Sequence, residues 1–380
     1  MNKVSIAVVG DVLDINCWSS TPYYFFTVGA RHGIFHIPWR LQLDKLKLPR
    51  YYWNAQQFLL HGNMGGFQYS PYFLNLAEQQ IPASHFASMV ISFNQLFPRA
   101  STIIKHGGKI YYYLDATLHD LFHSPAYKLH VPVKVRQQAI AQEFENYQRC
   151  EGVVTMGRWI HKTLREIYQV PQHKLFHILP GANLELPSKF QFNDSAENPQ
   201  SSRLILGFVG KDWQRKGLLL VYEVQQILQK KGYDVIIKII GSCPDELLRK
   251  PGIAYCGFIH KQTDTERFVK EIASCDIGCL FSADEALGIS VLEFLRVGVP
   301  VAGFFHQGMK DTLMEGASFR FRPNATAENI AHAFEQYILD TRLRKNLKQK
   351  AMEYSTYVTW DRCVTEWKQL LIAHHALPEG

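Results

Sequence analysis

The sequence predicts an α/β protein with two domains, each built on a parallel sheet that helices cover. Three observations carry this prediction. The chain has 380 residues, a length that favours two domains over one or three. Apolar residues make up 47% of it, which is enough for two buried cores. Short apolar runs bounded by glycine alternate with segments of helical spacing, as strands and crossover helices do.

The alternation is clearest in the second half. Predicted strands occupy residues 204–210, 235–241, 253–258, 276–281 and 300–304. Predicted helices occupy residues 217–231, 265–274 and 288–298. Strands and helices at this spacing are typical of a doubly wound parallel sheet.

The first half repeats this order less regularly. Predicted strands occupy residues 5–9, 88–93, 109–114, 152–155 and 175–179. The aromatic-rich region 31–80 gives no clear pattern. Residues 187–203 contain Pro, Ser, Asn and Asp with little apolar content, so we expect an exposed linker. Residues 354–373 have the spacing of a helix that packs on a core.

Composition limits the function classes without choosing one. The formal net charge of +7 is spread along the chain, which suits phosphorylated substrates, an anionic membrane surface or nucleic acid. The seven cysteines include no Cys-x-x-Cys pair, and reduced thiols predict a cytosolic protein. We expect Cys275 and Cys279 to be buried small hydrophobes. No apolar stretch approaches the roughly 20 residues of a membrane helix.

Residues 281–293 carry the strongest site prediction. A strand ends, a short loop contains Glu285, and a helix is expected near Gly288. Amides at a helix N-terminus bind phosphate, and a glycine admits the ligand to the backbone. Glu285 can accept hydrogen bonds from sugar hydroxyls, and Glu293 is placed to reach a ribose. The plainer alternatives are a helix-start carboxylate and a solvated charge, although apolar neighbours of Glu293 oppose the second.

Residues 208–217 have the same strand, loop and helix order, with cations in the loop. Arg215 and Lys216 directly precede Gly217. A diphosphate leaving group gains negative charge as the sugar–phosphate bond breaks, and Arg and Lys can stabilise that charge. Taken alone, the two side chains are better explained as solvated surface cations.

Together these segments resemble family 4 glycosyltransferases of the GT-B fold. Glu285 and Glu293 have that family's spacing, with seven residues between them, and a Gly-Val-Pro-Val turn and strand follows at 298–301. The glycine-ended strand before the Arg-Lys-Gly helix start matches as well. Residues 257–259, 275–277 and 354–362 add further matches in the same order. Order and spacing give the resemblance its specificity.

The resemblance implies two Rossmann-like domains that face each other across a cleft, with the last helix crossing back to the first domain. It assigns residues 1–183 to an acceptor-side domain, on which a helix from 358–380 packs, and residues 184–357 to a donor-binding domain. It further implies a retaining transfer of sugar from a nucleotide-diphosphate-sugar, with no metal and no cofactor. The acceptor, whether saccharide, lipid-linked or small molecule, is not indicated.

The same resemblance implies roles for individual residues. Arg215 and Lys216 would stabilise the donor diphosphate, Glu285 would hold the transferred sugar, and Glu293 the ribose. The remaining implied donor-binding positions are Gly210, Lys211, Ile259, Leu287, Gly288 and Ile289. Among them, the amides of residues 287–289 would face the distal phosphate and sugar, and the backbone around Ile259 the nucleobase.

The first half departs from the family. Its glycine-rich loop is replaced by Trp-Ser-Ser-Thr-Pro-Tyr at residues 18–23, similar to one subgroup. Where many members have a histidine after a central strand, this chain has Asp115, the candidate to bind a sugar hydroxyl or orient the acceptor. A carboxylate that caps the following turn is the equal alternative. His119 and His123 can share a helix face, but without a third ligand they predict no metal site.

Two other function classes stay open on sequence alone. A non-catalytic nucleotide-sugar sensor is suggested by the missing histidine, and a nucleotide-sugar epimerase would need no acceptor. The absence of a basic stripe or motif argues against a nucleic-acid partner. The expected location is the cytoplasm, and the positive charge leaves open a peripheral contact with the inner membrane face.

Overall fold

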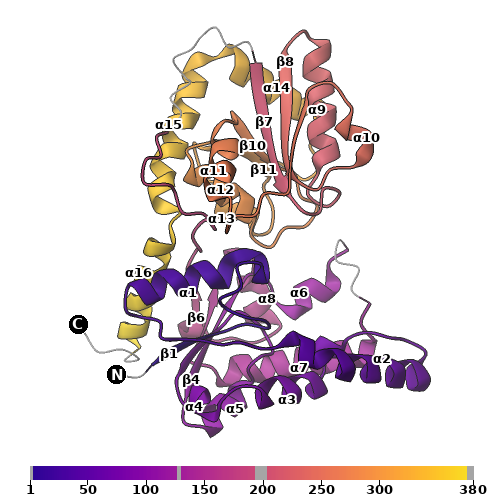
Figure 1. The fold of residues 1–380 in the computed structure, drawn as a ribbon, viewed down its shortest axis with the longest axis vertical. Coiled ribbons are helices and arrows are strands. Elements are labelled where there is room, and N and C mark those ends of the chain that lie inside the picture. Colours follow the sequence, from indigo (N-terminus) through magenta and orange to yellow (C-terminus); the bar gives the residue numbers. More distant parts are fainter. Residues whose placement is uncertain (1–2, 126–129, 193–202, 375–380) are drawn as a thin grey trace. The chain divides into compact units, whose positions relative to one another are not determined.

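The computed structural model describes residues 3–125, 130–192 and 203–374. It divides the chain into two compact units. Unit 1 comprises Met1–Pro180 and Trp360–Gly380, and unit 2 comprises Gly181–Thr359. The sequence-based boundaries, 183/184 and 357/358, lie two or three residues from these. Each unit contains one six-stranded parallel sheet with helices around it (Figure 1), which confirms the predicted α/β class.

The sheet of unit 1 has the order β2-β1-β3-β4-β5-β6. Its strands are β1 (Val4–Ala7), β2 (Ile37–Pro38), β3 (Met89–Ser92), β4 (Lys109–Leu114), β5 (Gly152–Thr155) and β6 (Leu175–His177). The sequence predicted all of them except β2, whose two residues are too few to form a pattern.

Nine helices belong to the described part of unit 1. They are α1 (Thr21–Arg31), α2 (Lys47–His61), α3 (Pro71–Gln79), α4 (Ala83–Phe86), α5 (Ala100–Lys105), α6 (Leu118–His123), α7 (Val133–Arg149), α8 (His161–Glu166) and α16 (Trp360–Ala373). The region that gave no clear pattern contains α2 and α3. It was hard to read because α2 exposes many of its apolar side chains.

The sheet of unit 2 has the order β12-β11-β10-β7-β8-β9. Its strands are β7 (Arg203–Gly210), β8 (Asp234–Gly241), β9 (Ile253–Gly257), β10 (Ile277–Leu280), β11 (Val301–Phe304) and β12 (Ser318–Phe321). Its helices are α9 (Leu218–Lys230), α10 (Asp245–Leu248), α11 (Thr265–Ala273), α12 (Ile289–Arg296), α13 (Met309–Thr312), α14 (Ala327–Leu339) and α15 (Thr341–Tyr357). Every strand and helix predicted for this half is present.

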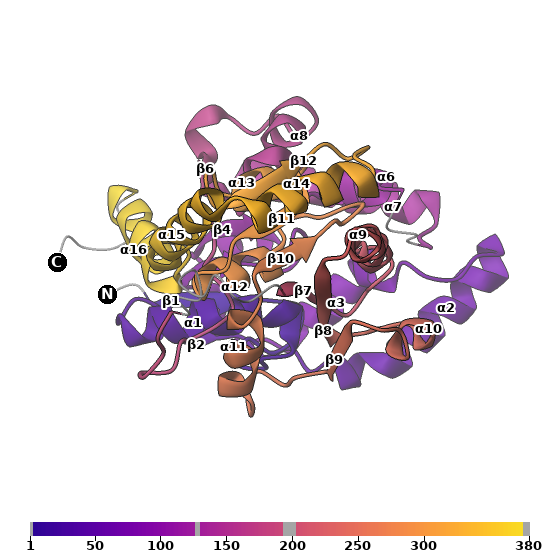
Figure 2. The same cartoon turned by 90° about the horizontal axis from the view of Figure 1, so that it is seen from above.

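Alternate side chains of β7 pack on opposite faces of this sheet, as the pleat requires. Leu206 and Phe208 belong to the core cluster that α9 and α14 complete. Gly207 points to the other face, where a Cβ would lie 2.7 Å from the ring of Phe294 in α12. Figure 2 shows α12 next to β10. The glycine therefore lets α12, which carries predicted site residues, approach the sheet closely.

The last helix, α16, completes the core of unit 1. The rings of Trp360 and Trp367 each lie 5.8 Å from the ring of Phe25 in α1. Trp367 also packs on Tyr113 of β4, with ring centroids 5.2 Å apart. This matches the crossing helix that the resemblance implied. Residues 375–380 of the expected helix, and 193–202 of the expected linker, lie outside the described residues.

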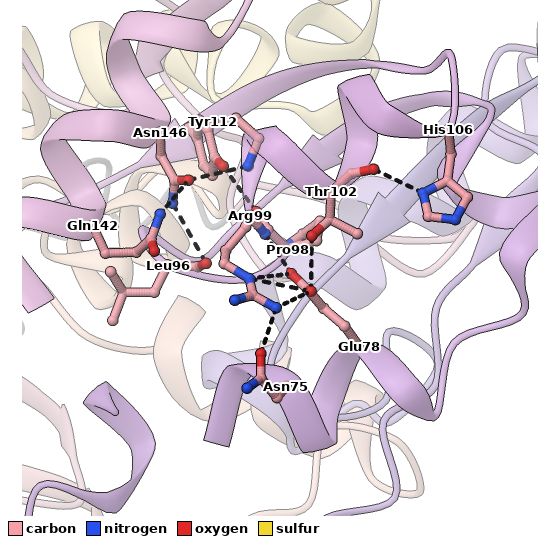
Figure 3. Close-up of polar contacts among 11 residues, drawn as sticks. Asn75, Glu78, Leu96, Pro98, Arg99, Thr102, His106, Tyr112, Gln142 and Asn146 are labelled. Carbon is pink, nitrogen blue, oxygen red and sulfur yellow. Dashed lines mark hydrogen bonds and ion pairs between the residues drawn. The ribbon is translucent and has the colours of Figure 1, made fainter. Parts of the chain in front are cut away.

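A polar network fixes the loop between β3 and α5 (Figure 3). The Glu78 carboxylate of α3 accepts hydrogen bonds from the Arg99 guanidinium, from the Arg99 backbone N–H at 2.9 Å, and from the Thr102 hydroxyl at 2.9 Å. From α7, the Asn146 side chain accepts from the Ala100 N–H at 3.0 Å and donates to the Gln95 carbonyl at 2.9 Å. Buried groups are thus paired at a loop beyond a strand's carboxyl end.

Candidate donor site in unit 2

Three loops meet at the carboxyl ends of β7, β10 and β11. The Ala283 N–H donates to the Arg215 carbonyl at 2.9 Å, which ties the loop after β10 to the loop after β7. The Glu285 N–H donates to the Gln307 side-chain oxygen at 2.8 Å, and this contact adds the loop after β11. Because β7, β10 and β11 are neighbours in a parallel sheet, their loops emerge at one edge. The two predicted segments therefore lie together.

Gly217 makes the close approach of the first two loops possible. Its φ of +78° is left-handed, and a Cβ there would lie 2.4 Å from the Phe281 carbonyl oxygen. A side chain at this position would be strained by the left-handed backbone and would also clash with the carbonyl oxygen. The sequence motif that ends in Gly217 is thus required by the junction between β10 and the start of α9.

Arg215 and Glu285, two predicted catalytic residues, form an ion pair. The Arg215 Nη1 atom lies 3.3 Å from the Glu285 Oε2 atom and also donates to the Ser282 hydroxyl at 3.1 Å. The Arg215 Nε atom lies 3.3 Å from the Asp212 carboxylate. The side chains of Arg215 and Glu285 are only 18% and 12% exposed, so water screens the pair weakly. The guanidinium therefore holds the Glu285 carboxylate in place.

Lys216 differs from its neighbour. It is half-buried, and its ammonium has no hydrogen bond or ion pair with any residue that the structure describes. Its stem passes over Gly210, where a Cβ would lie 2.6 Å from the Lys216 Cδ atom. Gly210 thus gives room to this side chain. A cation without a protein partner beside a strand end can bind an anionic ligand.

Helix α12 begins four residues after Glu285. Gly288 is its N-cap with a φ of +82°, and no side chain caps the helix. The first amides of α12 are consequently available to another acceptor. The neighbouring Leu287 side chain is buried, and its carbonyl accepts a hydrogen bond from the Thr312 hydroxyl at 3.0 Å. Ile289, the first helical residue, is half-buried.

Glu293 is only 2% exposed, which excludes the alternative of a solvated charge. Its carboxylate forms an ion pair with Lys261, whose ammonium also lies 4.8 Å from the centre of the Phe268 ring. Sequence reasoning missed Lys261, because nothing in its neighbourhood indicates a partner on a helix 32 residues away. The ion pair gives this buried carboxylate the cationic partner that a buried charge requires.

The remaining predicted donor residues lie near β9 and the β7 loop. The Ile259 side chain is buried just beyond β9. The Lys211 ammonium lies 5.1 Å from the centre of the exposed Phe258 ring. His306, Gln307, Ser282 and Asp284 also belong to the three loops, and the His306 Nε2 atom lies 3.0 Å from the Ser282 carbonyl oxygen. Ser282 and Asp284 lie within the predicted segment 281–293, but their contacts with Arg215 and His306 were not predicted.

Asp115, the remaining predicted catalytic residue, belongs to unit 1. It is half-buried and directly follows β4. The N-cap of the next helix, α6, is Thr117, whose side chain accepts from the Asp120 N–H. Thr117, and not Asp115, is therefore the N-cap of α6. The start of α6 is anchored by Glu143, which accepts from the Leu118 N–H at 3.0 Å.

Glu143 is fully buried in unit 1. Besides the Leu118 amide, its carboxyl accepts hydrogen bonds from the hydroxyls of Tyr147, at 2.6 Å, and Tyr168. Burial raises the pKa of Glu143 to about 8, and the three hydrogen bonds oppose that rise. No sequence signal pointed to this residue, because a Glu within α7 looks like any solvated helix charge.

The loop that replaces the family's glycines has unusual backbone angles. Trp18, Ser19 and Ser20 have φ values of 47°, 55° and 75°. Left-handed conformations are costly for residues with a Cβ, so this stretch before α1 is strained. Serines thus adopt here the backbone region that glycine favours.

The structure gives no metal-binding group of three or more His, Cys, Asp or Glu side chains within its described ranges. His119 and His123 share a face of α6 as predicted, with ring centroids 4.3 Å apart. Cys275 and Cys279 are buried, as expected. Among the residues described, no helix is both long enough and apolar enough to cross a membrane.

Comparisons with known proteins find similar sequences and similar folds. Residues 189–354 match the family model for glycosyl transferases group 1. A curated D-inositol 3-phosphate glycosyltransferase from Corynebacterium urealyticum is 24% identical over 233 residues. That match covers 57% of this chain and 54% of the relative, so the chain matches about half of the relative's length.

Two solved structures resemble the whole chain. Sucrose-phosphate synthase from Thermosynechococcus elongatus has a TM-score of 0.68 at 15% identity, covering 99% of this chain and 100% of that one. Anabaena HepE, solved in complex with UDP and glucose, has a TM-score of 0.62 at 14% identity, with coverage of 99% and 100%. At such identities the likeness concerns the fold. The chain thus has the GT-B fold, and its residues 189–354 match the glycosyl transferases group 1.

Proposed function

We propose that the chain transfers a sugar, with retention of anomeric configuration, from a nucleotide-diphosphate-sugar to a saccharide, lipid-linked or small-molecule acceptor. The observation that carries this proposal is Lys216, a half-buried cation without an acidic partner among the described residues. It adjoins Arg215, which is bound to the loop that leads into the uncapped helix α12. Two cations and a helix N-terminus suit a diphosphate.

Each side chain then has a distinct task. Lys216 neutralises charge that develops on the leaving diphosphate, and the amides at the start of α12 bind its oxygens. Arg215 divides its donors between the loop and the phosphates. Glu285, held by Arg215, accepts hydrogen bonds from hydroxyls of the transferred sugar. Glu293 accepts a hydrogen bond from a ribose hydroxyl, using carboxylate lone pairs that do not bind Lys261.

The donor and the location are part of the proposal. The HepE complex contains UDP and glucose, which makes UDP-sugars the first donors to try. Asp115 is proposed to orient the acceptor or bind a sugar hydroxyl. We propose that the protein acts in the cytoplasm, without a metal or cofactor, and meets a membrane only peripherally.

The test uses purified protein, a panel of UDP- and GDP-sugars, and NMR detection of the product's anomeric proton. An acceptor-dependent product with the donor's anomeric configuration supports the proposal. Binding of a nucleotide-sugar without any turnover would identify a sensor instead. A changed sugar on the nucleotide, formed without acceptor, would identify an epimerase. Either result would overturn the transfer proposal.

A further inference from the structure

Helix α2 in unit 1 turns an apolar face to solvent. Leu48, Tyr52, Ala55 and Leu59 are spaced four, three and four residues apart, so they form one stripe along the helix. Leu48 is 79% exposed and Leu59 is 83% exposed. The opposite side of the helix carries the buried polar residue Gln57. This arrangement reverses that of an ordinary surface helix, whose apolar stripe faces the core.

The stripe belongs to a larger apolar surface. Tyr51 and Phe58 flank it and are themselves more than half exposed, as is Met64 just beyond the helix. Figures 1 and 2 both show α2 at the rim of unit 1. Scattered exposed apolar residues need no explanation, but a continuous patch of this kind marks an interaction site.

The helix is fixed firmly enough to present this face. The Trp53 ring stacks on Tyr72 of α3, and its Nε1 atom donates to the Gly65 carbonyl at 3.2 Å. The Asn54 side chain accepts from the Gly65 N–H at 3.2 Å. Gly65 in turn approaches the start of α7 so closely that a Cβ would lie 2.4 Å from the His130 carbonyl oxygen. The exposed side is therefore a defined surface.

The charged side chains of α2 itself, Lys47 and Arg50, are both positive. From residue 45 to residue 77 the sequence contains no Asp or Glu, while Lys45, Lys47 and Arg50 are all exposed. Lys47 is paired with Asp44, which lies just before the stretch. At the other end of α2, the start of α7 adds Val133, which is 68% exposed, and the exposed Lys134. Basic residues next to exposed apolar and tyrosine side chains are typical of helices that lie in a membrane interface.

We propose that α2 docks unit 1 onto the surface of an anionic phospholipid bilayer. Leu48, Leu59 and Phe58 enter the acyl boundary, the tyrosines lie at the headgroup level, and Lys45 and Arg50 contact lipid phosphates. The 15-residue helix is about 22 Å long and lies in the plane of the interface. This deepens the proposed peripheral location by naming the face and the lipid charge, and it does not depend on sugar transfer.

The test is sedimentation of the full chain with sucrose-loaded vesicles, without donor or acceptor. Vesicles of phosphatidylcholine are compared with vesicles in which about a third of the lipid is phosphatidylglycerol. We expect binding that requires the anionic lipid and weakens as salt rises. The double variant Leu48→Ser/Leu59→Ser should lose at least about tenfold in vesicle affinity. Lys45→Gln/Arg50→Gln should weaken binding to the anionic vesicles.

The control pair is Ile104→Ser/Leu339→Ser, which replaces two exposed apolar residues of other helices, α5 and α14. It should bind vesicles like the unaltered protein. Because all four positions are exposed, circular dichroism should report folded proteins throughout. Equal vesicle affinity of the α2 variant and the control, or binding that does not depend on lipid charge, would overturn the proposal. A protein that is a dimer, and becomes monomeric in the α2 variant, would also overturn it, because a second copy would then cover this face. None of these outcomes bears on whether sugar is transferred.

Discussion

At the scale of single residues, the candidate donor site depends on which charges already have partners. Arg215 shares its guanidinium among Glu285, Ser282 and Asp212, whereas Lys216 has no such partner in the described chain. The two adjacent cations therefore contribute differently. Arg215 organises the loop, and Lys216 is available to the ligand.

Lys216→Ala and Glu285→Ala should each lower turnover by at least about tenfold, which corresponds to roughly 1.4 kcal/mol of barrier. The first removes charge stabilisation from the leaving group, and the second removes a sugar contact. Steady-state kinetics with the donor found by the panel measures both. Lys310→Ala, at an exposed lysine of α13, is the control and should keep its rate. Unaltered rates in the two site variants would refute the assignment.

Glu143 gives unit 1 a pH-dependent stability. Its pKa is raised to about 8 in the folded chain, whereas in the unfolded chain it should lie near the ordinary 4.5. Between these values only the folded state holds the proton, so the free energy of unfolding falls as pH rises from about 5 to about 8. Through one titrating group, the free energy of unfolding can change by at most about 1.4 kcal/mol per pH unit.

Glu143→Gln should remove this slope, because an amide does not titrate. Urea unfolding of unit 1, followed at several pH values, measures it. Glu145→Gln on the same helix is the matched control, since that carboxylate is partly exposed and paired with Arg149. A variant at position 143 with an unchanged slope would mean that other groups cause the pH dependence.

The sequence could predict some of these residues but not their partners. Glu285 and Glu293 lie in one short segment and Arg215 and Lys216 in another, so their spacing in the sequence is enough to indicate a site. The Lys261–Glu293 pair joins α12 to the loop after β9, and its contact exists only in the folded chain. Glu143 was missed for the same reason, because its three donors come from α6, α7 and a tyrosine 25 residues later.

At the scale of elements, the strands of both sheets were predictable because buried parallel strands are short continuous apolar runs. The prediction failed where an element breaks the usual pattern. Strand β2 has two residues, and α2 carries its apolar stripe on the outside. Periodicity reports that a helix is amphipathic, but it does not report which face is buried.

Gly217→Ala tests the junction between β10 and α9. The substitution meets both a left-handed φ and a carbonyl oxygen 2.4 Å from the new Cβ, so we expect unit 2 to lose about 2 kcal/mol or more. Gly232→Ala separates the two causes, because Gly232 has a φ of +89° but open space around it. That control should lose about 1 kcal/mol. Equal losses in denaturant unfolding would show that the close approach carries no extra cost.

At the scale of the whole molecule, each unit has its own sheet and its own core clusters. A ligand that binds the loops of unit 2 should therefore protect that unit first. By mass action, a nucleotide at a hundred times its dissociation constant adds about 2.7 kcal/mol to the unit that binds it.

Trp367→Ala tests whether the stabilities of the two units are independent. The indole is fully buried against Phe25 and Tyr113, so its removal should destabilise unit 1 by about 3–5 kcal/mol. Hydrogen exchange read by mass spectrometry should report faster exchange in β1, β4 and α1. The protection of β7 and α12 by UDP should stay as it is in the unaltered protein. Loss of that protection would mean that the two cores are not energetically independent.

The crossing of α16 also sets an order of events during synthesis. Residues 181–359 are contiguous and hold a complete sheet, so unit 2 needs no later residue to complete its fold. Unit 1 begins first but cannot close its core until Trp360 and Trp367 have left the ribosome. Until α16 emerges, the nascent residues of unit 1 expose the aromatic side chains that this helix covers.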